Sequence, residues 1–296
     1  MKRKWLAVCM TLSMIPGLIA CGSTENEGTR NVQDISSEKE EKAVSNEADK
    51  QISDVARSMI EHLGYPHKVF AAGTDYDEIM KEYENSLERG KAEGFIPVLV
   101  PVDDTLDEFF GILKDDGYSY EDVLKKDIDA AEGERFLAKR FEEYISDMEE
   151  DFDMTLEDFI GVYDDEPEYI ESYYSIRDYR DNKTLETIMF EVPTKNPWEL
   201  VAYVPFGGWN ECPEVEEMLA VCKYWYEKYG AVPVTISHDI LEMSVPSPVS
   251  ESDALELAKE HYAFTPDRVD QGTSTNTLSE VAECLKVSKI WFFWWD

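Results

Sequence analysis

The sequence predicts an α/β fold, in which helices cover a mixed β-sheet that follows a helical N-terminal extension. Three observations lead to this prediction. Hydrophobic residues make up 43% and aromatic residues 12% of the 296 residues, which is enough apolar material for a packed core. Segments with the apolar pattern of strands alternate with segments at helical spacing. Several of the helical segments also carry clear start and stop residues.

The clearest helix is predicted at residues 213–229. Its apolar residues recur at helical spacing, Pro213 suits the first position, and Gly230 suits the stop. Gly64 and Gly90 are the expected stops of two earlier helices. The other helices are expected at residues 51–63, 76–89, 105–113, 120–128, 132–152, 250–262 and 278–285.

Strands are expected at residues 95–102, 185–192, 200–206, 232–237 and 290–295. Pro97 and Pro101 favour a sheet edge for the first of these strands, because proline has no N–H donor. In the last strand, alternation puts three aromatic residues on one face and two on the other. That pattern allows two interpretations, a central strand buried on both faces or an aromatic wall that binds a sugar ring, a peptide or a partner. The three are Trp291, Phe293 and Trp295, and the two are Phe292 and Trp294.

The first residues resemble a bacterial lipoprotein signal peptide. A basic start is followed by an apolar stretch too short to span a membrane, which ends in the lipobox-like run Leu18-Ile19-Ala20-Cys21. This resemblance implies cleavage before Cys21 and lipidation of its thiol, which would anchor the chain at the cell membrane on the extracytoplasmic face. We therefore expect a signal peptide at residues 1–20 and the lipidated Cys21 with a flexible acidic linker at 21–50.

The charge balance restricts the partners. With 28 Lys and Arg against 64 Asp and Glu, the formal net charge is −36, which argues against nucleic acid as a partner. Residues 141–176 contain fourteen of the acidic residues and no Lys or Arg. That stretch is either a solvated acidic face or a binding site for divalent cations or a basic partner. No calcium-loop motif supports the cation alternative, and no cofactor or metal is predicted.

Seven runs between residue 95 and the end of the sequence resemble a bacterial family known as domain of unknown function 4253. The resemblance implies a compact α/β domain without an assigned reaction, and we expect it to span residues 95–296, after a helical extension at 51–94. The runs are residues 95–100 (FIPVLV), 196–198 (NPW), 204–213 (VPFGGWNECP), 223–231 (KYWYEKYGA), 237–239 (SHD), 260–267 (EHYAFTPD) and 291–296 (WFFWWD).

A ligand-binding site is predicted where three of these runs meet. Paired glycines before a helix permit positive φ and favour an anion at the helix start, although a tight packing turn fits as well. A histidine and an aspartate just after a strand stand where α/β proteins often place functional groups. The candidate ligand-binding residues are Gly207, Gly208, Trp209, Asn210, His238, Asp239, His261 and Asp267.

Cysteine chemistry is a weaker alternative. Cys212 precedes a helix, where its thiolate would be stabilised, and a nearby histidine would serve as its base. With Cys222 and Cys284 the mature chain has three further cysteines, so at most one intramolecular disulfide forms. There is no C-x-x-C, G-x-S-x-G or H-E-x-x-H motif.

The sequence favours a non-enzymatic protein that binds a protein, a peptide or a small molecule outside the cytoplasm. An immunity-like protein that neutralises a basic toxin through its acidic surface is one variant of this function. The alternative is a hydrolase that uses His238, Asp239 and His261, with or without a metal. These two classes differ in whether the three side chains converge in one pocket.

Overall fold

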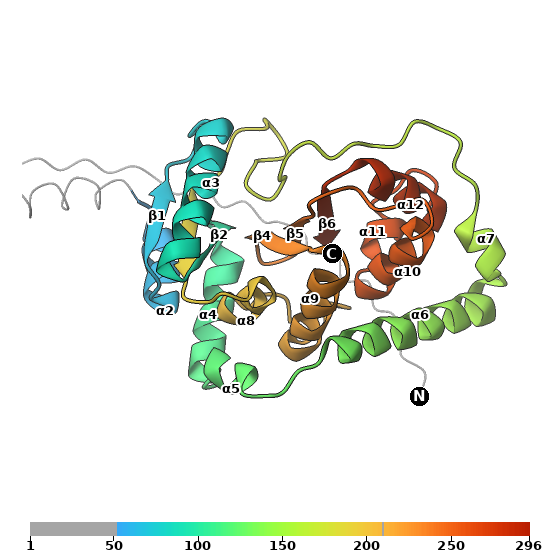
Figure 1. The fold of residues 1–296 in the computed structure, drawn as a ribbon, viewed down its shortest axis with the longest axis horizontal. Coiled ribbons are helices and arrows are strands. Elements are labelled where there is room, and N and C mark those ends of the chain that lie inside the picture. Colours follow the sequence, from blue (N-terminus) through green and yellow to red (C-terminus); the bar gives the residue numbers. More distant parts are fainter. Residues whose placement is uncertain (1–51, 209) are drawn as a thin grey trace, which may run out of the picture. The chain divides into compact units, whose positions relative to one another are not determined.

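One mixed sheet of six strands organises the described part of the chain, and helices cover it (Figure 1). This computed structural model describes residues 52–208 and 210–296. The strand order is β1-β3-β2-β4-β5-β6, and all neighbours are antiparallel except the parallel pair β2 and β4. The strands are β1 (His67–Phe70), β2 (Ile96–Pro101), β3 (Thr187–Val192), β4 (Val232–Ile236), β5 (Ile240–Ser244) and β6 (Ile290–Trp294).

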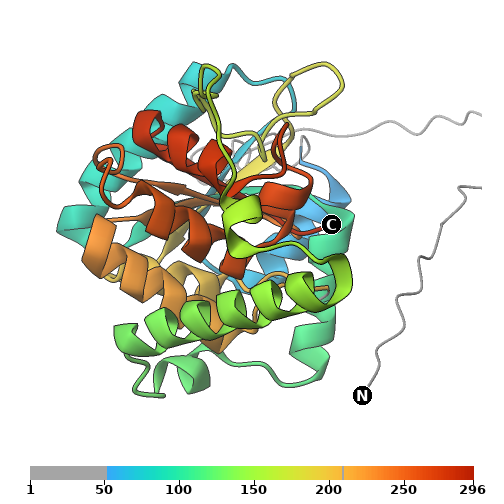
Figure 2. The ribbon, with the colours of Figure 1, turned by 90° about the vertical axis from the view of Figure 1, so that its right-hand side faces the viewer.

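The helices confirm the α/β class that the sequence predicts. The long helix α6 packs against α9 and α10, and it lies along the near side of the molecule in Figure 2. No helix in the described ranges combines the length and hydrophobicity of a membrane-spanning segment. The helices are α2 (Asp54–Leu63), α3 (Tyr76–Glu93), α4 (Asp104–Asp115), α5 (Tyr120–Leu124), α6 (Ala130–Phe152), α7 (Leu156–Ile160), the 3₁₀ helix η1 (Pro197–Glu199), α8 (Leu200–Tyr203), α9 (Val215–Tyr229), α10 (Ala254–Phe264), α11 (Asp267–Asp270) and α12 (Leu278–Val287).

The two faces of the sheet bury two separate cores. Along β2, Val98 and Val100 join the large core with α9, α10 and α12, whereas Leu99 joins a smaller core with α3. This alternation follows from the two-residue period of a strand. Because both faces are covered, β2 reads as a continuous apolar run.

The prediction that β2 lies at a sheet edge is wrong, because β2 runs between β3 and β4. The Val102 amide donates to Glu186 beside β3, so the odd-numbered positions of β2 turn their amide positions toward β4. Pro97 and Pro101 therefore lack their N–H groups on the β4 side, where Leu99 with Thr235 is the one pair in register. The prolines shorten that ladder without excluding β2 from the interior.

Two further expectations are corrected by the structure. Residues 200–206 do not form a strand: Leu200–Tyr203 is the short buried helix α8, and a brief apolar run does not distinguish the two structures. The strand β6 is the last in the sheet order rather than a central one. One of its faces is buried and the other is half-buried, so the alternation predicted for its aromatic residues is confirmed.

A long segment, residues 161–186, connects α7 to β3 and runs along one side of the sheet (Figure 1). We call this segment the strap. Glu242 on β5 is fully buried and fastens the strap to the sheet. Its carboxylate accepts hydrogen bonds from the Tyr174 amide at 2.7 Å, from the Ser175 amide and hydroxyl at 3.1 and 2.7 Å, and from the Thr235 hydroxyl at 2.7 Å. Burial raises the pKa of Glu242, although these hydrogen bonds oppose the shift.

Candidate functional site

A polar cluster lies at the turn between β4 and β5, around His238. The Nδ1 atom of His238 is paired with the carboxylate of Asp103, the N-cap of α4, and its Nε2 atom lies 3.5 Å from Asp239. Asp239 accepts hydrogen bonds from the Ser237 hydroxyl at 2.9 Å and from the indole Nε1 of Trp294 at 3.0 Å. The imidazole is therefore held between two carboxylates. One of them, Asp239, also contacts the end of β6 through Trp294.

The electrostatics of this cluster favour an ion pair. Burial lowers the pKa of His238, but the hydrogen bond to Asp103 and the charges of Asp239 and Asp103 outweigh it, so the net shift is upward. Burial raises the pKa of Asp103, but His238 and the amides of Leu106 and Thr105 outweigh it, so the net shift is downward. A protonated His238 thus links α4 to the β4–β5 turn.

We expect the His238–Asp103 pair to stabilise the fold in a pH-dependent way. The pKa of His238 is raised, so its contribution is complete below the unfolded value of about 6.5 and is lost as pH rises through the folded pKa. The pKa of Asp103 is lowered, so its contribution is complete above the unfolded value of about 3.8 and is lost as pH falls through the folded pKa. Replacement by His238→Asn should cost about 1 kcal/mol near pH 5 and less at pH 9.

Urea unfolding of both proteins across this pH range measures the effect. The exposed His67 provides a control variant, His67→Asn, because its Nδ1 contacts the Tyr65 carbonyl rather than a carboxylate. A cost for His238→Asn that stays constant from pH 5 to pH 9 would contradict the ion pair.

The predicted glycine turn lies next to His238, but its amides bond to other groups of the protein. Gly207 and Gly208 both have positive φ, at 83° and 87°, as expected for paired glycines. The Gly207 amide donates to the His238 carbonyl at 3.2 Å, and the Gly208 amide interacts with the Cys212 thiol. A Cβ on Gly207 would stand 2.4 Å from Cys212 Sγ, so this glycine makes room for the thiol.

The remaining residues of this turn contribute little polar geometry. Asn210 is exposed with a φ of 49°, and Trp209 and the lipidation candidate Cys21 lie outside the described residues. Burial raises the pKa of Cys212 to about 12, which is the opposite of the thiolate stabilisation expected from its place before a helix. Cys212, Cys222 and Cys284 are free thiols.

His261 does not join the polar cluster. Its ring is fully buried, with ring centroids of Phe293, Trp291 and Trp225 at 4.6, 4.9 and 5.3 Å. Neither ring nitrogen has a hydrogen-bond partner among the described residues, and burial and the Arg268 charge lower its pKa well below the ordinary value. His261 is therefore a neutral part of the aromatic core.

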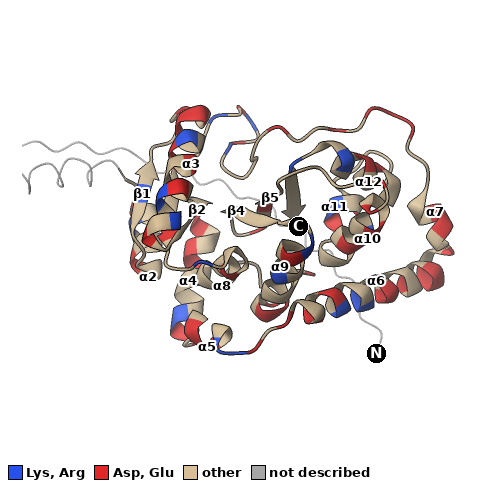
Figure 3. Ribbon diagram, viewed as in Figure 1, with Lys and Arg blue, Asp and Glu red and all other residues tan. Residues whose placement is uncertain are grey.

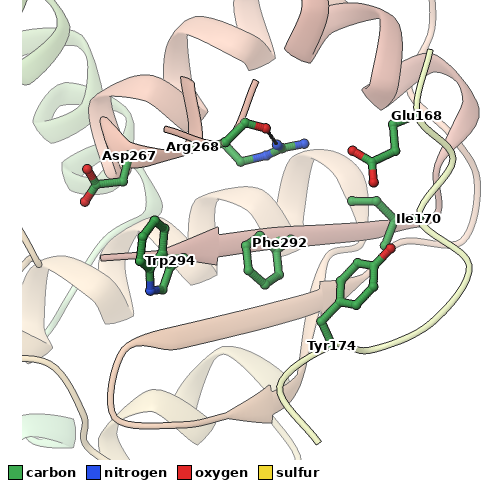
Figure 4. A pocket seen from close by; sticks show the side chains of 8 residues that line it. Glu168, Ile170, Tyr174, Asp267, Arg268, Phe292 and Trp294 are labelled. Atoms are coloured by element: carbon green, nitrogen blue, oxygen red, sulfur yellow. Dashed lines mark hydrogen bonds between the residues drawn. The ribbon is translucent and has the colours of Figure 1, made fainter. Parts of the chain in front are cut away.

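A small pocket opens beside β6, on the face of that strand that lies under the strap (Figure 4). Its volume is about 130 Å³. Trp294 connects it to the polar cluster, because this indole both lines the pocket and donates to Asp239. Asp267 also lines it, but its carboxylate accepts from the Asp296 amide and the Gln271 side chain. The lining residues are Glu168, Ile170, Tyr174, Asp267, Arg268, Gly272, Phe292 and Trp294.

The buried arginine of this lining, Arg268, was not among the site residues predicted from the sequence. This side chain belongs to α11 and its residue is only 7% exposed. Its Nη1 lies 3.5 Å from the Gly272 carbonyl, and its Nε has no hydrogen-bond partner in the described structure. The signal was present, since Arg268 directly follows the candidate Asp267, but the sequence gives no indication that an arginine there is buried.

The acidic stretch at residues 141–176 covers the outer part of α6, α7 and the first part of the strap (Figure 3). Most of its carboxylates are exposed, as a solvated face requires. In the described ranges no three His, Cys, Asp or Glu side chains are grouped to hold a metal ion. Binding of a basic partner to this face stays a prediction, which weaker binding at high salt would support.

The fold and these sites define an α/β domain with a mixed sheet and a small pocket at its β6 edge. Residues 188–296 match the model of a family described as Domain of unknown function (DUF4253). The matched range begins within β3 and contains β4, β5, β6, His238, Asp239 and Arg268, while Asp103 and the strap precede it. No curated protein and no solved structure matches the chain.

Proposed function

We propose that this protein is a membrane-anchored bacterial lipoprotein that binds a ligand outside the cytoplasm without catalysing a reaction. One observation carries the binding role: the pocket beside β6 combines the charge of the largely buried Arg268 with the half-buried rings of Phe292 and Trp294. Apolar walls with a few oriented polar groups are typical of small-molecule sites.

A binding role accounts for the histidines better than a hydrolase does. Both ring nitrogens of His238 face carboxylates, so its proton serves an ion pair that joins two elements. His261 is enclosed by aromatic rings in the core. A general base needs to reach the proton that it removes, and neither side chain lines the pocket beside β6.

The anchor prediction concerns Cys21. We expect the full-length chain to incorporate a labelled fatty acid and to sediment with membranes, because several acyl chains bind a bilayer firmly. Cys21→Ser should abolish the label and release most of the protein from the membrane fraction. Cys9 lies within the apolar leader and provides the control, since Cys9→Ser should retain both properties. Equal labelling of the Cys21→Ser chain would contradict the anchor.

A panel of small molecules tests the binding role. Neutral sugars, monocarboxylates, alkylammonium ions and amino acids, each added to the full-length chain in detergent micelles, represent four classes of charge. We expect at least one class of compound to bind with saturable heat in calorimetry. The Phe292→Ser variant should lose this binding, and the bound compound should be recovered chemically unchanged. Absence of binding by all four classes, or turnover of the bound compound, would contradict the proposal.

A further inference from the structure

Opposite charges face each other across the pocket beside β6. In Figure 4 the Arg268 guanidinium lies above the Phe292 ring and points toward Glu168, which lies on the strap above Ile170, while Asp267 points away. Within the described chain no ion pair joins Arg268 to Glu168. Burial lowers the pKa of Arg268, and the charges of Cys284 and Glu168 only partly oppose that shift. The pocket thus offers one cationic and one anionic group at separate points.

We propose that this pocket binds a small zwitterion, an α-amino acid, with its carboxylate on Arg268 and its ammonium group on Glu168. This inference rests on the proposed binding function and names its ligand class. A guanidinium holds a carboxylate through paired N–H donors, and the Arg268 side chain lines the pocket and points toward Glu168. The exposed Glu168 and the faces of the Phe292 and Trp294 rings suit an ammonium group.

The charge of the surroundings selects against simple ions. Glu168 and Asp267 both line the pocket beside the one arginine, and the whole chain has a formal net charge of −36, so a plain carboxylate would meet net repulsion. A plain ammonium ion would be repelled by the Arg268 guanidinium and would give it no anionic partner. A zwitterion satisfies both groups and adds no net charge.

The volume restricts the side chain of the ligand. A cavity of about 150 Å³ holds benzene, and this pocket measures about 130 Å³. An amino acid of that size is alanine or serine, with its side chain against the buried Ile170. Larger amino acids would project past Tyr174, which is 42% exposed.

A matched set of ligands tests the inference by calorimetry on the full-length chain in detergent micelles. L-Alanine carries both charges, L-lactate replaces the ammonium group by a hydroxyl, and L-alaninamide replaces the carboxylate by an amide. We expect L-alanine to bind at least tenfold more tightly than either analogue. Glu168→Gln should weaken L-alanine at least tenfold and should not weaken L-lactate, since it removes a charge that repels a carboxylate. Arg268→Gln should weaken L-alanine and L-lactate and should not weaken L-alaninamide, which is a cation.

Two controls separate a folding defect from a lost contact. Glu171→Gln changes an exposed carboxylate on the strap outside the pocket lining, and it should bind L-alanine as the unmodified chain does. If Arg268→Gln fails to fold, the exposed Glu168 still decides the question, because its replacement spares the core.

Equal affinity for L-alanine and L-lactate, or an L-alanine affinity unchanged by Glu168→Gln, would overturn the zwitterion. If a sugar from the four-class panel binds at this pocket while L-alanine does not, the inference fails and the binding function stands. If neither the panel nor this set binds, the binding function itself fails.

Discussion

Replacing Glu242 by alanine should lower the free energy of unfolding by about 4 kcal/mol. The substitution leaves the amides of Tyr174 and Ser175 and the Thr235 hydroxyl without their acceptor, whereas the Ser175 hydroxyl can still donate to Thr235 at 2.7 Å. A buried unsatisfied donor costs about 1–3 kcal/mol. The loss is also local, because the strap is then released from the sheet. Denaturant unfolding measures the first effect. Limited trypsin digestion measures the second, since the strap contains Arg177, Arg180 and Lys183.

Two further variants serve as comparisons for Glu242→Ala. Glu242→Gln keeps one acceptor oxygen and should cost about half as much. Glu256→Ala removes an exposed carboxylate whose ion pair joins it to Lys259 on the same helix, and it should change stability by less than about 0.5 kcal/mol. If Glu242→Ala unfolds like the unmodified chain and its strap resists trypsin equally, Glu242 does not fasten the strap.

Trp225→Ala should lower the free energy of unfolding by a similar amount, about 4 kcal/mol. The Trp225 ring is fully buried at the centre of the large core and stacks on Phe293 with centroids 5.2 Å apart. Its edge contacts with Phe264 and Trp291 tie α9 to α10 and β6. The substitution therefore leaves a cavity where three elements meet, and thermal or denaturant unfolding measures the cost.

The smaller loss expected for Trp198→Ala provides a comparison, because this half-buried indole packs on Tyr226, itself 36% exposed. We expect that variant to cost about 1 kcal/mol. Trp225→Phe should fall between the two, since it keeps a ring but loses the 2.8 Å hydrogen bond from the indole to Glu260. Similar costs for Trp225→Ala and Trp198→Ala would contradict the central role of Trp225.

Single glycines in the sequence were sufficient to predict the ends of two helices. Gly64 and Gly230 both adopt left-handed conformations at helix ends, as their positions predicted. Gly90 was expected to stop a helix, but α3 continues to Glu93 and ends at Gly94. A Cβ on Gly90 would stand 2.3 Å from the Phe95 carbonyl oxygen, so this glycine allows close packing. Sequence alone does not separate these two uses of glycine.

Which short segments form strands, and where each strand lies in the sheet, depends on tertiary contacts. The sequence predicted β2, β3, β4 and β6, but β1 and β5 were missed because each is short and has no strong alternation. The place of β2 in the sheet depends on which neighbour faces Pro97 and Pro101, and that is a property of the assembled sheet.

The candidate site was predicted in part. His238, Asp239, Gly207 and Asp267 do lie around the end of β6, through contacts with Trp294 and with one another. His261 belongs to the core instead, since its side of α10 faces the rings of Trp225 and Phe293. The charges of the pocket come from residues that no motif marks, a buried arginine and a strap glutamate, so sequence patterns could not supply them.

A crystal structure of the chain grown with L-alanine tests the central claim most directly. The account predicts electron density for one amino acid in the pocket beside β6, with its carboxylate on the Arg268 guanidinium and its ammonium group on Glu168. An empty pocket at saturating L-alanine, or an amino acid bound at His238 and Asp239 instead, would contradict it.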